Sequence, residues 1–303
     1  MVARRSLIIA LFLAFSVPVE AAQSGMDRVK VLLESGTPTE AITALRQLVR
    51  DEPANAAAHN MLGSLLNSGG NYAEALPHAE AAARLDPGNV PYRYNRGVVR
   101  AEHGRFVEAV ADFDAALAAD PNQPYAWLER GAAKLSLGDV AGARADWRTA
   151  ATRDPKLIWT HWYEATGDFV EGRFVEAAAG FDRVAAAEPG FVPAKLWRAI
   201  AHARAGTPLA VEEPGSADWP APAVRFLRKK VDEAALLMTA GEDRVSGDKR
   251  RTAEAYFFIA QRALIDGDTA AARDHLRRAL AIPSPRHVWR IAAEGDLNQL
   301  EDR

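Results

Sequence analysis

The feature that most constrains this chain is a set of residues that recur every 34 positions. Three residue types repeat at that spacing, each at its own place in the period. They are the prolines Pro53, Pro87, Pro121, Pro155 and Pro189, the glycines Gly36, Gly70, Gly104, Gly138, Gly172 and Gly206, and the alanines Ala41, Ala75, Ala109, Ala143 and Ala177. Because a fixed period of roughly 20 to 50 residues is typical of repeat architectures, we expect an array of similar units.

Each recurring residue has a physical role in a pair of helices. Glycine allows the positive φ of a tight turn between the two helices. Proline ends the second helix, because it lacks an N–H and clashes with the preceding turn. The small alanine lets the two helices approach closely, and larger residues fill another equivalent position: Leu45, Phe113, Trp147 and Phe181. Each unit is therefore predicted to be a helix, a glycine turn and a second helix, with an acidic residue before the proline.

The pattern resembles the tetratricopeptide repeat family, whose units carry aromatic, Gly, Ala and Pro residues at fixed places. The unit at residues 124–157 is a good example, with Trp127, Gly131, Ala143, Trp147, Ala150 and Asp154-Pro155. The resemblance covers about two thirds of the chain. It implies an all-α, right-handed superhelical solenoid of helix pairs that takes part in protein–protein interaction.

The prolines after Gly206 break the period and suggest three regions beyond the N-terminus. Residues 22–206 are predicted to be the solenoid, with about five repeats and the first helix of a sixth. Residues 207–252 are expected to be an irregular helical insert, and 253–303 a degenerate repeat with a capping helix. This last third is similar to NlpI-type periplasmic lipoproteins in Trp219-Pro220, Phe226-Leu227 and Glu254-Ala255-Tyr256-Phe257. It departs from them in lacking the cysteine that carries the lipid.

The N-terminus has the layout of a secretory signal. Arg4 and Arg5 precede the apolar stretch Leu7–Val17, and Val19-Glu20-Ala21 offers a cleavage site. The apolar stretch is shorter than the about 20 residues that span a bilayer. We therefore expect residues 1–21 to be a signal peptide cleaved after Ala21, or alternatively after Ala22, and a periplasmic protein. An uncleaved N-terminal anchor is the alternative.

The composition argues against several kinds of chemistry. The chain has no cysteine, which excludes disulfides, thiolate metal sites and cysteine catalysis. Its 37 basic and 40 acidic residues are balanced, which argues against a nucleic-acid partner. No phosphate-binding loop or hydrolase motif is present, so we expect no cofactor and no enzyme activity. His161, Glu164 and Asp168 share one predicted helix face, but helix packing explains them better than a metal site.

The family resemblance also implies a binding site on the first helices of successive repeats, which line a concave groove. The side chains expected to form a peptide-binding groove are Asn60, Asn67, Tyr94, Tyr125, Leu128, Trp159, Trp162 and Phe169. Aromatic side chains suit such a site because they bury a large area at low entropic cost. The alternative is that several of them, Trp159 and Phe169 above all, pack between helices or under the irregular C-terminal third.

These observations favour an exported scaffold or adaptor with no catalysis of its own. The expected partner is a protein or peptide of the cell envelope, and the membrane is contacted only through the N-terminal signal or anchor. The alternative is a homo-oligomerising structural module, such as a homodimer, that is anchored by an uncleaved N-terminus.

Overall fold

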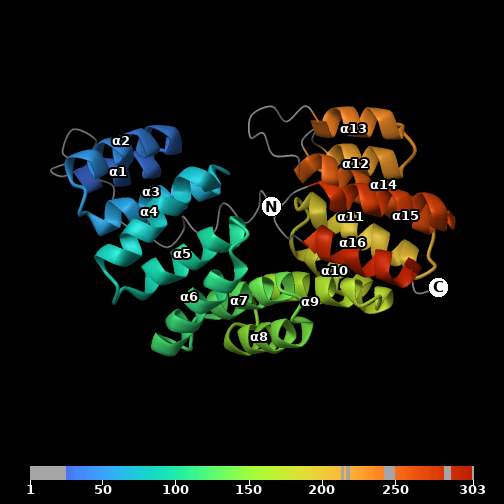
Figure 1. Ribbon diagram of the computed structural model, residues 1–303, viewed down its shortest axis with the longest axis horizontal. Helices are drawn as coiled ribbons and strands as arrows, with labels where there is room; N and C mark the ends of the chain where they lie inside the picture. The colour runs from blue at the N-terminus through green and yellow to red at the C-terminus, as the bar shows by residue number, and fades with distance from the viewer. Residues whose placement is uncertain (1–24, 213–214, 216–218, 242–249, 283–287, 302–303) are drawn as a thin grey trace. The chain divides into compact units, whose positions relative to one another are not determined.

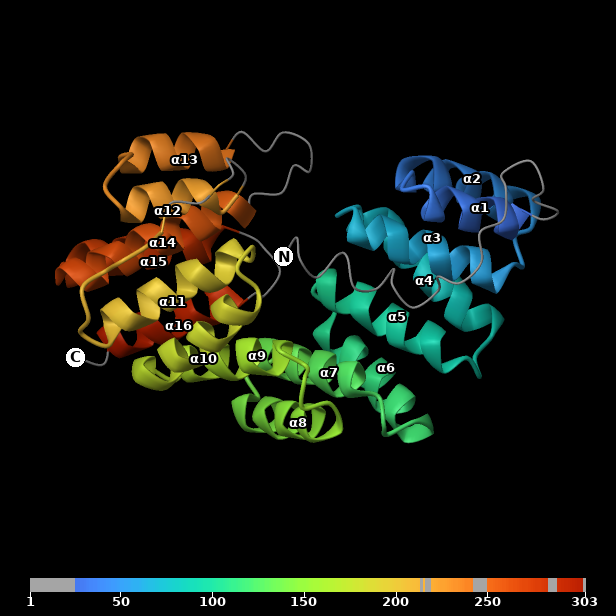
Figure 2. The same cartoon turned by 180° about the vertical axis from the view of Figure 1, so that it is seen from behind.

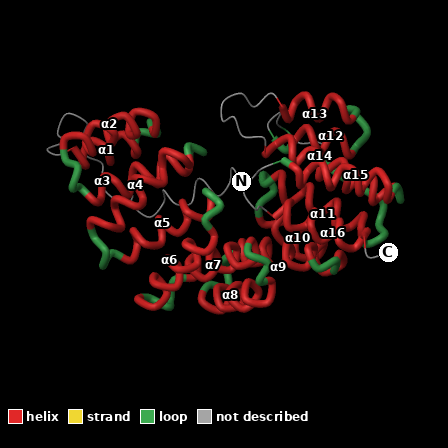
Figure 3. Tube along the Cα trace, viewed as in Figure 1, coloured by secondary structure: helices red, strands yellow, loops and turns green. Residues whose placement is uncertain are grey.

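The computed structural model describes residues 25–212, 215, 219–241, 250–282 and 288–301. These residues form sixteen α-helices and no strand, as Figures 1 and 3 show. None of the described helices has the length and apolar character needed to cross a membrane. The predicted signal peptide at residues 1–21 lies outside the described residues. The all-α class expected from the period is confirmed.

The chain divides into two compact units between Ala133 and Lys134, each described by itself here. The boundary falls inside α7 (Pro124–Ser136), within the region predicted to be the solenoid. Unit 1 holds three complete helix pairs before α7. They are α1 (Gly25–Glu34) with α2 (Pro38–Asp51), α3 (Ala56–Ser68) with α4 (Tyr72–Leu85), and α5 (Val90–Glu102) with α6 (Phe106–Ala119).

Unit 2 continues the pairs and then departs from them. Its repeat helices are α8 (Val140–Arg153), α9 (Trp159–Val170), α10 (Phe174–Ala187) and α11 (Val192–Arg204). Two short helices lie in the predicted insert, α12 (Ala221–Leu227) and α13 (Glu233–Gly241). A last pair follows, α14 (Arg250–Asp266) with α15 (Thr269–Ala281), and then α16 (Val288–Glu301). Figure 2 shows these helices from the opposite side.

The recurring glycines have the backbone geometry that the turns require. Each of the six glycines of the period, Gly36 to Gly206, has a positive φ, and so does Gly267 between α14 and α15. The values lie between 73° and 95°, a region that side chains other than glycine rarely adopt. Gly267 therefore gives α14 and α15 the same kind of turn as the repeat pairs, and the degenerate repeat at residues 253–303 stays a prediction.

Two other repeated residues shape the start of the next pair. Asn55 and Asn89 cap α3 and α5, each accepting a hydrogen bond from a backbone N–H three residues ahead. The side-chain amides of these asparagines donate to Glu52 and Asp86, over 2.7 and 3.1 Å. In these two repeats, the acidic residue before the proline thus orients the cap of the following helix.

Each pair is held together by small residues opposite large ones. All five alanines of the period are fully buried, as are Phe113, Trp147 and Phe181. In the α5–α6 pair, a Cβ atom placed on Gly97 would lie 2.8 Å from the ring of Phe113. The glycine is therefore needed for the aromatic ring to fit against α5.

One continuous core joins the repeats of unit 2 to its C-terminal third. Every helix from α9 to α16 contributes buried residues to it. A buried polar network also crosses this core: Arg204 of α11 donates to Asp296 of α16 over 2.8 Å and to Gln261 of α14 over 2.8 Å. Gln261 in turn donates to Asp296 over 2.7 Å. The network ties three helices together with its polar groups paired.

Candidate protein-binding surface

The predicted groove residues fall into both units, and their accessibility differs between them. Asn60, Asn67, Tyr94, Tyr125 and Leu128 belong to the first helices of unit 1 (α3, α5 and the start of α7). Trp159, Trp162 and Phe169 belong to α9 of unit 2.

The two asparagines of α3 are half-buried and differ in their hydrogen bonding. The amide oxygen of Asn60 accepts a hydrogen bond from Asn95 of α5 over 2.9 Å, which links the first helices of two successive repeats. The amide oxygen of Asn67 is buried and has no hydrogen-bond partner. An unpaired buried acceptor costs free energy, so a donor of a partner could satisfy the Asn67 oxygen only after the half-buried side chain turns outward.

The aromatic side chains of unit 1 lie at two depths. Tyr94 of α5 is half-buried, and its ring centroid lies 5.9 Å from that of Phe113. Tyr125 near the start of α7 is 37% exposed, which makes it the most accessible aromatic of the predicted set. Leu128, one turn later, is only 1% exposed. Leu128 is thus a core residue and presents no surface to a partner. The remaining four side chains, Asn60, Asn67, Tyr94 and Tyr125, are called the first-helix surface below.

In unit 2, two of the three predicted groove residues are buried. Phe169 is 2% exposed and packs against Phe174 and Trp197, with ring centroids 5.2 and 5.0 Å apart. Trp159 is 7% exposed and meets Phe191 edge-on at 5.3 Å. Both follow the packing interpretation, so they are not available as contact residues in this structure.

Trp162 has an intermediate position. It is half-buried and packs against the rings of Phe181 and Phe191, each at a centroid distance of 5.2 Å. Its exposed part could contact a partner, but its replacement would also disturb this aromatic cluster. Trp162 is therefore a poorer probe of binding than Tyr125.

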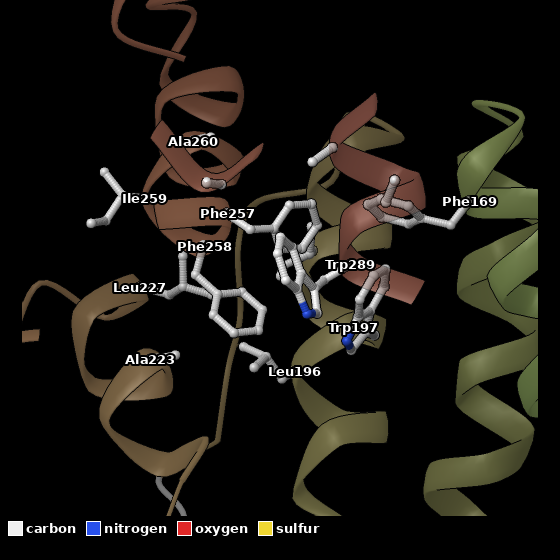
Figure 4. Packing of buried hydrophobic residues seen from close by; sticks show 14 of the residues in the cluster. Phe169, Leu196, Trp197, Ala223, Leu227, Phe257, Phe258, Ile259, Ala260 and Trp289 are labelled. Carbon is white, nitrogen blue, oxygen red and sulfur yellow. The ribbon is translucent and has the colours of Figure 1, made fainter. Parts of the chain in front are cut away.

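The burial in unit 2 has a structural cause that the repeat pattern does not contain. Helix α16 packs against α9, where a Cβ atom on Gly295 would lie 3.1 Å from the carbonyl oxygen of Val170. On α11, Leu196 is fully buried in the core that α12 and α14 share. Figure 4 shows Leu196 close to Leu227 and Phe258, and Phe169 beside Trp197. The C-terminal helices of the chain thus cover the face of α9 and α11 on which the groove was predicted, as the packing alternative described for Phe169.

The histidine of the predicted α9 face has no metal-binding surroundings. The described residues contain no group of three or more His, Cys, Asp or Glu that could hold a metal ion. Burial lowers the pKa of His161, with a smaller contribution from the charge of Arg183. Asp168 is paired with Arg144 at 2.7 Å and with Arg173 at 2.7 Å. Asp168 is accounted for by these ion pairs, whereas the buried Nδ1 atom of His161 has no hydrogen-bond partner.

The sequence analysis missed the buried ion pairs between the helices of a repeat. Asp112 is 4% exposed and pairs with Arg96 and with Arg100, at 2.9 Å for the latter. One period later, Asp146 is 3% exposed and pairs with Lys134 at 2.9 Å. A signal was present, since Arg100 and Lys134 are 34 residues apart, as are Asp112 and Asp146. Charged residues that share a place in the period can be found by aligning the units.

Comparison with known proteins agrees with the repeat assignment. A sequence model of the tetratricopeptide repeat family matches residues 26–90 and 92–158. A tetratricopeptide repeat protein from Parabacteroides merdae ATCC 43184 has a similar structure, with a TM-score of 0.53 and 18% identity over 90% of this chain and 98% of that one. Residues 26–90 and 92–158 thus match the tetratricopeptide repeat family, and the fold of the chain is the all-α solenoid of that family.

A second solved structure shows the same fold in a larger protein. The Cut9–Hcn1 hetero-tetramer of the APC/C is similar with a TM-score of 0.56 and 16% identity, over 90% of this chain and 48% of that one. This chain thus spans about half the length of that chain. No curated protein sequence matches. The likeness of residues 207–303 to NlpI-type proteins stays a prediction.

Proposed function

We propose that this protein is an exported scaffold or adaptor that binds a protein partner and has no catalysis of its own. The tetratricopeptide repeat fold supports a role in protein–protein interaction. The observation that carries the proposal is the first-helix surface of unit 1, which combines an accessible tyrosine with a buried, unpaired amide oxygen. Tyr125 supplies apolar contact area, and Asn67 supplies an acceptor once its half-buried side chain turns toward a donor of the partner.

The binding role of Asn67 can be separated from its effect on folding. The nearly isosteric variant Asn67→Leu removes an unsatisfied acceptor, so we expect it to raise the free energy of unfolding of unit 1 by about 1 kcal/mol. The same variant should weaken partner binding, since the acceptor is lost. A gain in stability with unchanged binding would show that Asn67 does not contact the partner.

The direct test is an affinity capture with residues 22–303 from the envelope fraction of the source organism. Proteins retained by the wild type should be lost with Tyr125→Ala, while helicity measured by circular dichroism stays unchanged. Val107→Ala is the matched control, because Val107 is 66% exposed on a second helix, α6, away from the first-helix surface. Equal capture by wild type, Tyr125→Ala and Asn67→Leu would contradict the proposed surface.

Export is part of the proposal and rests on the layout of residues 1–21. Expression of the whole chain in a Gram-negative host should yield a periplasmic protein whose measured mass is that of a chain beginning at Ala22. A protein that keeps residues 1–21 and sediments with membranes would favour the anchored alternative.

The second candidate is a homo-oligomerising structural module. Light scattering of residues 22–303 separates the two: a single-chain mass at micromolar concentration favours the adaptor. A mass twice as large, lost in Tyr125→Ala, would assign the first-helix surface to a sister chain.

A further inference from the structure

Repeat 2 of unit 1 replaces a charged contact by a pair of histidines. His78 of α4 stands one period before Asp112 and two periods before Asp146. Those two aspartates pair with arginine or lysine of the facing first helix. His78 instead meets His59 of α3, with their Nδ1 atoms 3.0 Å apart and their ring centroids 5.2 Å apart. The two helices are still in contact at this position, but the contact is made by two imidazole rings, which can each bind a proton.

The surrounding atoms define which ring nitrogen carries hydrogen. The Nε2 atom of His59 lies 3.2 Å from the carbonyl oxygen of Pro53, which can only accept a hydrogen bond. Neutral His59 therefore carries its hydrogen on Nε2 and presents a lone pair at Nδ1. His78 must then donate its Nδ1–H to that lone pair.

The pair tolerates one added proton but not two. The first proton can be held by either ring, because a single hydrogen then still lies between the two Nδ1 atoms and the hydrogen bond is strengthened by charge. The second proton leaves hydrogens on both Nδ1 atoms. Two N–H groups then face each other across 3.0 Å, and two positive rings repel within a half-buried contact.

The neighbouring charges do not offset this repulsion. Burial lowers the pKa of His78, and the charges of His59 and Arg46 lower it further, whereas Glu74 raises it. Glu74 of α4 is bound to Arg46 of α2 at 2.7 Å, so its charge is largely neutralised. The folded state of repeat 2 thus resists protonation of His78 once His59 is charged.

We propose that His59 and His78 form an acid-released latch between α3 and α4, which holds the two helices together until both rings are protonated. The equivalent contacts at Asp112 and Asp146 are ion pairs with arginine or lysine and contain no histidine, so the release is confined to repeat 2.

The direction of the pH effect follows from the lowered pKa of His78. Between that pKa and the unfolded value of about 6.5, the unfolded chain binds more protons than the folded one. The stability that the latch contributes is therefore present above about pH 6.5 and is lost as the pH falls through this window.

The tautomers give the first test, by ¹⁵N NMR of the histidine rings in residues 22–303 at pH 7.5 with a chelator present. We expect His78 to carry its hydrogen on Nδ1, the tautomer that free histidine favours less, and His59 on Nε2. His78→Gln assigns the signals, and His103→Gln, an exposed histidine of the same unit, is the control. A signal of His78 protonated on Nε2 alone at pH 7.5 would overturn the latch.

Hydrogen exchange at pH 7.5 and 5.0 gives the second test. After correction for intrinsic rates, we expect the protection of α3 and α4 amides to fall about tenfold more than that of α5 and α6, which is the order of effect of two like charges at this separation. The double variant His59→Gln/His78→Gln should lose this difference, and His103→Gln should keep it. Equal loss in both pairs, or an unchanged difference in the double variant, would contradict the proposal.

Discussion

The first helices of unit 1 and those of unit 2 obey the same repeat pattern but present different surfaces. In unit 1, the amide oxygen of Asn67 on α3 has no hydrogen-bond partner, and Tyr125 on α7 is 37% exposed. In unit 2, Phe169 and Leu196 occupy the corresponding kind of position on α9 and α11, and both are buried. The comparison shows that the period determines which way a side chain points, while the rest of the chain determines whether anything covers it.

The C-terminal helices that cover α9 and α11 in unit 2 are held partly by polar contacts. Arg204, Gln261 and Asp296 satisfy one another inside the core, so the C-terminal helices are held at a defined place on α11. Apolar burial alone would allow small shifts of these helices. Paired polar groups at fixed distances restrict them.

The largest expected effect separates a covered position from an open one. Phe169→Ala should lower the free energy of unfolding by about 3–5 kcal/mol, because it leaves a cavity among aromatic rings. Tyr125→Ala should change it by no more than about 0.5 kcal/mol. Urea unfolding followed by tryptophan fluorescence measures the first well, since of the 7 tryptophans only Trp127 lies in unit 1. Similar losses in both variants would erase the proposed difference between the units.

A somewhat smaller effect should follow when the cover is loosened at its polar network. Asp296→Ala leaves Arg204 and Gln261 without their shared acceptor, so we expect a loss of about 3 kcal/mol and greater quenching of tryptophan fluorescence by acrylamide. Glu301→Ala, on the same helix as Asp296, removes an exposed ion pair with Arg277 of α15 and should cost less than about 1 kcal/mol. Equal losses would mean that the buried network does not hold α16 in place.

The smallest effect tests what the two units share. Gly36 and Gly206 have φ values of +73° and +95°, and nothing lies within 4 Å of a Cβ atom placed on either. Gly36→Ala and Gly206→Ala should therefore each cost about 1 kcal/mol, from backbone conformation alone. Gly190→Ala, at a glycine without a positive φ and also with open space around it, should cost less in thermal unfolding. Clearly unequal costs at Gly36 and Gly206 would show that the turns differ.

Much of the fold follows from the sequence because each repeated residue acts locally. Gly70 needs only its own φ, and Pro87 needs only the helix that it ends, so their spacing predicts the turns. Helices were also predicted in the C-terminal third, where α14 and α15 lie on either side of the glycine turn at Gly267. For Phe169 the sequence left two alternatives open, a groove contact or burial under the C-terminal third, and could not decide between them. The burial of Phe169 depends on Trp197 and on α16, more than 100 residues later, and no local pattern encodes that contact.

The His59–His78 contact was missed for a different reason. The two residues are 19 positions apart and lie on different helices, so no single helix pattern brings them together. Only an alignment of the repeats shows that His78 occupies the same position as Asp112 and Asp146. Polar contacts between facing helices can be predicted once the register of a repeat is known. They cannot be read from a single helix.

The cover of α9 and α11 also determines how this array can change in size. A repeat array usually grows when a unit is duplicated and packs against the apolar face of the terminal repeat. In unit 2 that face is already occupied by α12, α14 and α16, which share one core with the repeats. An added repeat beyond α11 would have to displace these helices and expose their apolar side chains. Repeats therefore cannot be added after α11 without disrupting this core. Gain or loss of a repeat is tolerated only at positions where a repeat packs directly against another repeat.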